Sequence, residues 1–148
     1  MTQLVRDLAE SVGLLDQVKA TSSTLASTLW LDGDEKQGND TSRPARCLLL
    51  SDWPGGNVVG FAVYYYTYST WLAKPGVFLE DLFVRPHERG KGYGKKLLAE
   101  VAKRVEDIGG GRLHWYVQIQ AIRGSFRRYL HIPAGIVLLG LALSNRKV

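Results

Sequence analysis

The hydrophobic positions of the chain follow two different periods, which divide it into helices and strands. An amphipathic stripe predicts a long helix over residues 92–107, and shorter helices are predicted at 3–10 and from Thr21 to about Leu31. The stripe of the long helix consists of Leu97, Leu98, Val101, Val105 and Ile108. Apolar, β-branched and aromatic runs predict strands at 45–51, 58–68, 77–84 and 113–119.

Turn residues separate these elements and fix their order. The breakers between Asp52 and Asn57 predict a hairpin, three glycines after residue 108 end the long helix, and the polar segment 32–44 reads as a loop. The order is helix, helix, three strands, helix, strand. We therefore expect an α/β (α+β) fold, with an antiparallel hairpin that leads into a βαβ-like unit. The length of 148 residues predicts one domain spanning 1–148.

The composition of the chain also predicts where in the cell the protein is located. The chain is 45% hydrophobic and 22% charged, and its one cysteine, Cys47, cannot form an internal disulfide. The N-terminus lacks the basic and apolar regions of a signal peptide, and the apolar stretch from Ile132 to Leu143 is too short to span a bilayer. These features predict a cytoplasmic protein with no membrane association.

Positive charge is concentrated where a strand meets the long helix. Residues 85–104 have a net charge of +5, the same as the whole chain. Gly90, Gly92 and Gly94 would let a bound group approach the backbone, and the start of a helix offers free N–H groups to an anion. The flanking cations are Arg89, Lys91 and Lys95. The segment thus predicts a pyrophosphate cradle.

Other phosphate sites and other uses of this charge fit less well. A P-loop requires glycine where Arg89 stands and Ser or Thr where Lys96 stands, and a Rossmann fingerprint requires G-x-G-x-x-G instead of G-x-G-x-G. A solvated lysine-rich helix face is the simplest alternative. A nucleic-acid-binding module is the weakest, because the aromatic residues lie on strands and not among the lysines. No metal-ligand spacing is present in the sequence.

The glycine-rich run resembles a known family. Arg89-Gly90-Lys91-Gly92-Tyr93-Gly94 is similar to the R-x-x-G-x-G signature of GNAT superfamily N-acetyltransferases. The runs Gly60–Trp71, Leu79–Val84 and Leu4–Glu10 resemble the diamine (spermidine/spermine) and thialysine acetyltransferase branch. This resemblance extends from about residue 3 to about Trp115 and is densest from Gly60 to Lys96.

The resemblance implies a fold, a co-substrate and an activity. The fold would be the GNAT acyl-CoA N-acyltransferase fold, a mixed, mostly antiparallel sheet flanked by helices. The co-substrate would be acetyl-CoA, and a primary amine of a small polyamine or lysine-like acceptor would attack it directly in a ternary complex. The resemblance also implies a homodimer, while an incomplete and inactive acetyl-CoA binder is the alternative reading.

The resemblance also assigns roles to residues. The backbone of Leu82, Phe83 and Val84 would bind the pantetheine arm, and Glu80 would face the acceptor amine. The pyrophosphate would be held by Arg89, Gly90, Lys91, Gly92, Tyr93, Gly94 and Lys95. Regular alternation along the strand would place Glu80 on the face of Leu82 and Val84, and Asp81 on the other face, where it would bind or orient the acceptor. The residues Tyr64, Tyr65, Tyr66 and Tyr68 either line an amine pocket or, for the most part, pack in the sheet.

Two parts of the family pattern are missing from the sequence. The family begins with a strand before the first helix, and after its fifth strand it has a W-N-x-P-(A/S)-x-x-F-Y motif whose tyrosine protonates the leaving thiolate. Here the tail 116–148 diverges, Tyr129 is only a faint counterpart, and residues 108–148 contain no acidic residue. We therefore expect that the tail comes from another reading frame or an unspliced intron, and that the start comes from a late initiation codon. The missing elements would leave strand edges open, which predicts a poorly soluble monomer.

Overall fold

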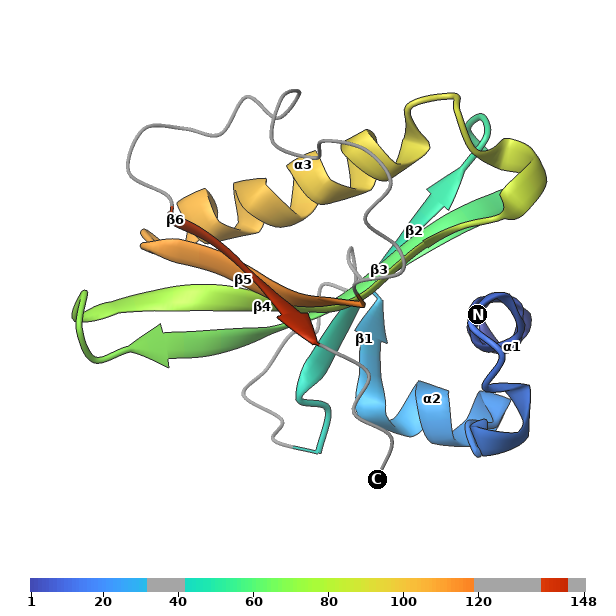
Figure 1. Ribbon diagram of the computed structural model, residues 1–148, viewed down its shortest axis with the longest axis horizontal. Helices are drawn as coiled ribbons and strands as arrows, with labels where there is room; N and C mark the ends of the chain where they lie inside the picture. The colour runs from blue at the N-terminus through green and yellow to red at the C-terminus, as the bar shows by residue number, and fades with distance from the viewer. Residues whose placement is uncertain (32–41, 119–136, 144–148) are drawn as a thin grey trace.

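A computed structural model describes residues 1–31, 42–118 and 137–143, which form one six-stranded sheet with helices on both faces (Figure 1). The strands are β1 (Leu29–Leu31), β2 (Ala45–Ser51), β3 (Val58–Ser69), β4 (Lys74–Val84), β5 (Arg112–Gln118) and β6 (Val137–Leu143). The helices are α1 (Thr2–Ser11), α2 (Ser22–Thr28) and α3 (Tyr93–Asp107), with 3₁₀ turns η1 (Leu15–Gln17) and η2 (Pro86–Glu88). The predicted α/β (α+β) fold class is confirmed.

The sheet is mixed, and its strands follow one another in sequence order. The central strands β2, β3 and β4 are antiparallel, whereas β1 pairs with β2, β5 with β4 and β6 with β5 in parallel. The longest pairing is that of β3 with β4, whose hairpin projects at one end of the sheet (Figure 1). The antiparallel centre therefore carries the parallel unit β4-α3-β5 on one side.

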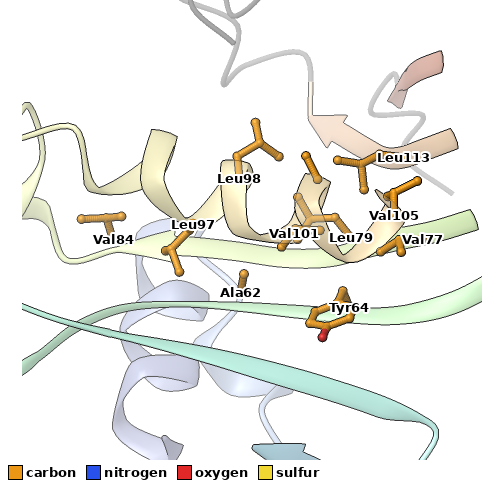
Figure 2. Packing of buried hydrophobic residues seen from close by; sticks show 11 residues of the cluster. Ala62, Tyr64, Val77, Leu79, Val84, Leu97, Leu98, Val101, Val105 and Leu113 are labelled. Carbon is orange, nitrogen blue, oxygen red and sulfur yellow. The ribbon is translucent and has the colours of Figure 1, made fainter. Parts of the chain in front are cut away.

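Helix α3 buries the predicted stripe against one face of the sheet (Figure 2). Leu97, Leu98, Val101 and Val105 are buried, and Ile108 is half-buried. They meet inward-facing strand residues that are 9% exposed or less, namely Ala62, Tyr64, Val77, Leu79, Val84 and Leu113. Each fully buried leucine or valine side chain contributes roughly 1.5–3 kcal/mol of transfer free energy, so this face fixes the position of α3.

The opposite face of the sheet is covered by α1. Leu4 packs with Cys47, Phe61 and Phe83, which are all nearly inaccessible to solvent. Because Phe61 and Ala62 are neighbours in β3 and belong to different clusters, the two helices lie on different faces. The lone cysteine is therefore a buried core residue, as expected.

Two short strands were not predicted from the sequence. Helix α2 has the predicted Thr21 cap, but it ends at Thr28, and Leu29–Leu31 instead pairs with Ala45–Cys47. Strand β6 pairs with β5 along seven residues, so the expectation that β5 would be an open edge is wrong. In both cases pairing with a distant strand decided the outcome, which a local pattern does not reveal.

No helix among the described residues is long and apolar enough to span a bilayer.

Candidate functional site

The strands β4 and β5 diverge at the middle of the sheet. Only Gly76–Leu79 of β4 pairs with Arg112–Trp115 of β5. Beyond these residues β5 continues beside β6, and β4 continues beside β3. In the part of the chain that the structure describes, the stretch from Glu80 to Val84 has a partner strand on its β3 side alone. Its other edge offers backbone N–H and C=O groups to an extended ligand.

The glycine-rich turn joins the end of β4 to the start of α3. Gly90 and Gly92 have φ angles of 83° and 82°, a left-handed conformation that side-chain-bearing residues rarely adopt. Nothing lies within 4 Å of a β-carbon built at either position, so the backbone conformation and not crowding requires glycine there. Gly92 is the N-cap of α3 and no side chain caps it, which leaves the first-turn N–H groups of Tyr93 and Gly94 to a ligand.

Two of the predicted cations are engaged within the turn itself. The Nε of Arg89 donates a hydrogen bond to the Val84 carbonyl at 3.0 Å, and its guanidinium lies 5.8 Å from the centre of the Phe83 ring. The Nζ of Lys91 donates to Glu88 Oε2 at 2.8 Å, and this hydrogen bond is the main cause of a lowered Glu88 pKa. Glu88, which the sequence analysis did not single out, therefore holds Lys91 at the turn.

A β-bulge interrupts β4 at Glu80. Val63 pairs with Asp81 and Tyr64 with Leu79, so Glu80 is an extra residue with no partner in β3. Leu79 and Leu82 both pack toward α3, with two residues between them instead of one. The expectation that Glu80 shares a face with Leu82 and Val84 is therefore wrong, because regular alternation stops at the bulge.

The bulge brings two carboxylates together on the face opposite α3. Asp81 lies there beside Val63, as predicted, and is half-buried, whereas Glu80 is exposed. Burial, and then the negative charge of Glu80, raises the pKa of Asp81 above its ordinary value of 3.8. Two neighbouring carboxylates can attract a cation and accept a proton.

The four tyrosines of β3 have different environments. Tyr64 is fully buried under α3, and the guanidinium of Arg46 lies 4.9 Å from the centre of the Tyr66 ring. Tyr68 is 61% exposed near the hairpin tip. Burial, and then the negative charge of Glu80, raises the pKa of Tyr65 above its ordinary value of 10.0. Tyr65 therefore lies near Glu80, and the amine pocket stays a prediction.

The remaining candidates add little to the site. Tyr129 lies outside the described residues. His87 is exposed, 3.8 Å from Glu88, while burial and the charge of Arg112 lower the pKa of His114. Among residues 1–31, 42–118 and 137–143, no cluster of three or more His, Cys, Asp or Glu side chains could hold a metal ion.

The raised pKa of Asp81 has a measurable consequence for stability. A carboxyl group whose pKa is higher in the folded state destabilises the fold as pH rises through that folded pKa, and has no such effect below its unfolded-state pKa. We expect Asp81→Asn to stabilise the protein by about 0.5–2 kcal/mol at pH 7, with the gain vanishing near pH 3. Thermal denaturation at both pH values measures this, with the exposed Glu100→Gln as control. A gain that persists unchanged at pH 3 would contradict the stated cause.

Comparison with known proteins places acetyltransferases among the relatives of this chain. Residues 15–125 match the model of the acetyltransferase (GNAT) family. Bovine thialysine N-epsilon-acetyltransferase is 37% identical over 112 residues, which is 75% of this chain and 63% of the relative. The porcine enzyme is 35% identical over 108 residues, covering 72% and 61%. An L-ornithine N5-acetyltransferase from Arabidopsis thaliana is 45% identical over 60 residues, covering 40% and 26%. The chain thus spans less than two thirds of the length of these relatives.

Solved structures support the same fold. An aminoglycoside acetyltransferase from an uncultured soil metagenomic sample is 18% identical, with a TM-score of 0.60 over 80% of this chain and 70% of its own. A transcriptional regulator from Bacillus halodurans C-125 gives the same TM-score and identity over 81% and 77%. At such low identity the likeness shows the fold alone. Together with the family match over most of the sequence, it establishes that this chain belongs to the GNAT acetyltransferase family.

Proposed function

We propose that this chain is an N-acetyltransferase that moves an acetyl group from acetyl-CoA to a primary amine of a small polyamine or lysine-like acceptor. The names of its relatives support the acceptor class, since thialysine and L-ornithine both carry a primary amine on an alkyl chain. The resemblance of the motif and of the β3–β4 region to the diamine and thialysine branch agrees with this acceptor class.

The juxtaposition of the glycine turn with the open edge of β4 carries this proposal. The turn offers first-turn amides of α3 beside Arg89, Lys91 and Lys95, a set suited to a diphosphate. The edge at Leu82 and Val84 leads from this turn toward Glu80, and it suits the extended amide groups of a pantetheine arm. The Val84 carbonyl there already accepts a hydrogen bond from Arg89. The backbone groups of Phe83 point to β3, because the hydrogen bond from the Arg85 N–H to the Val59 carbonyl makes Phe83 and Phe61 a hydrogen-bonded pair.

The chemistry follows from what lies at the far end of this edge. A cationic amine would be attracted by Glu80 and Asp81, and one carboxylate would take the proton that the nitrogen must lose before it attacks. The nitrogen attacks the thioester carbon to form the N–C bond of a tetrahedral adduct, and collapse of this adduct breaks the C–S bond and releases coenzyme A as a thiolate. A strand N–H near Phe83 would stabilise the oxyanion. No covalent acyl-enzyme is proposed, since the one cysteine is buried.

Three finer expectations accompany this proposal. The homodimer implied by the resemblance and the cytoplasmic location stay predictions, as does the assignment of no nucleic-acid partner. The basic run has a role in the coenzyme site, so no separate nucleic-acid function is needed to explain it.

Calorimetric titration with acetyl-CoA, followed by a thiol-release assay with spermidine and thialysine, tests the proposal. Binding at micromolar to millimolar concentration and amine-dependent release of coenzyme A are the expected results. Folded protein that ignores acetyl-CoA at millimolar concentration would overturn the whole proposal. Binding without thiol release would instead support the inactive homologue.

A further inference from the structure

Four aromatic rings from three strands meet on the sheet face that carries Glu80. The ring of Phe78 is central: Tyr65 stacks on it at 5.0 Å with an interplanar angle of 22°, and His114 and Tyr116 meet it edge-on at 4.8 and 5.2 Å. Phe78 is only 8% exposed and forms the floor of this group. The cluster thus presents Tyr65 and Tyr116 toward solvent over a buried ring.

The register places Tyr116 at the point where β4 and β5 diverge. Leu79 and Trp115 are the last paired residues of the two parallel strands, so Glu80 and Tyr116 are the next residue on each. Tyr116 is 53% exposed, which is a large fraction for an aromatic residue. Burial, and then the charges of Glu80 and Tyr116, raises the pKa of Tyr65, in keeping with a position of Tyr65 near both groups.

The charges that face this cluster favour a cation. Glu80 and Asp81 contribute negative charge on this face. On β5 the nearest cation is Arg112, at the far end beyond His114, and burial and this arginine keep His114 neutral by lowering its pKa. Aromatic faces beside carboxylates are well suited to an ammonium group on an apolar stem.

We propose that Tyr65, Tyr116 and Glu80 form the seat of the acceptor, which selects primary alkylammonium compounds with a stem of several methylene groups. The stem lies against the two tyrosine rings, and the reacting nitrogen is held at Glu80, next to the open edge of β4. This inference rests on the proposed acetyltransferase function and specifies how its acceptor is recognised.

The test compares Tyr116→Ala and Tyr116→Phe with a matched control, Tyr68→Ala, which removes an equally exposed ring from the distant hairpin tip. Loss of one cation–aromatic and stem contact changes affinity by about 3- to 30-fold. For thialysine and spermidine we expect KM to rise by that factor in Tyr116→Ala, with kcat changed less than twofold. Tyr116→Phe and Tyr68→Ala should retain the wild-type KM. Acetyl-CoA affinity, measured by calorimetry, should be unchanged in all three variants.

Direct calorimetric binding of spermidine and thialysine in the presence of coenzyme A separates this inference from the proposed function. If the wild type binds the amine and Tyr116→Ala does not, the seat is supported even where no thiol is released. The inference is overturned if KM and amine affinity are the same in Tyr116→Ala and wild type, or if Tyr68→Ala changes them as much as Tyr116→Ala does. The acetyltransferase proposal stands in either case.

Discussion

Replacement of Glu80 by glutamine is expected to lower kcat for amine acetylation by about 100- to 1,000-fold, the usual effect of removing a general base. Glutamine keeps the size of the side chain and the backbone of the bulge, but it neither attracts an ammonium group nor accepts its proton. The measurement is steady-state thiol release across pH 6–10. The residual activity of the variant should rise with pH, because at high pH more of the amine is already deprotonated.

Two controls make this result interpretable. The affinity for acetyl-CoA should be unchanged, since Glu80 lies beyond the edge assigned to the pantetheine arm. Glu100→Gln, an exposed substitution on α3, should retain wild-type kcat. If Glu80→Gln keeps more than a third of the wild-type kcat, Glu80 is not the base, and the same assay on Asp81→Asn then shows whether Asp81 takes the proton.

Gly92→Val is expected to weaken acetyl-CoA binding by about 100-fold, the second large effect. Valine is strained at a φ of 82°, with a penalty of about 1–3 kcal/mol, and relief of the strain would move the first-turn amides away from the diphosphate. Calorimetric titration with acetyl-CoA and with coenzyme A measures the loss. The space around the position is open, so the variant should still fold.

Gly109→Val is the matched control for this variant. Gly109 follows the other end of the same helix, also has a positive φ, of 60°, and also has open space around it. Both variants should therefore lose similar stability in a thermal melt, whereas only Gly92→Val should lose affinity. Equal losses of affinity would mean that the turn does not bind the coenzyme and that strain acts through the fold as a whole.

Most of the central sheet and α3 could be predicted because their signals are local. The stripe from Leu97 to Val105 has the period of a buried helix, and the aromatic run of β3 follows a turn of strong breakers. The glycine turn at the start of α3 was predictable for the same reason, since its glycines and the flanking cations all lie between Arg89 and Lys95. Strands β1 and β6 were missed because their partners lie far away in the sequence.

The arrangement around Glu80 could not be read from the sequence. The bulge depends on the register between Val63–Tyr64 and Leu79–Asp81, and no breaker such as glycine or proline marks it. No local sequence pattern marks Tyr116 either. Its position matters because the pairing of β5 with β4 ends one residue earlier, at Trp115. Motif spacing thus led to the proposed coenzyme site, while the proposed acceptor side required the pairing of strands.

The extra residue in β4 also determines how the protein responds to deletions. Without Glu80, Leu79 and Asp81 would become neighbours, and β4 would alternate regularly while Val63 and Tyr64 kept their present partners. Leu82 and Val84 would still face α3 and Phe83 would still face α1, so both cores would be preserved. Loss of this single codon would therefore remove a carboxylate and straighten the strand without exchanging its two faces.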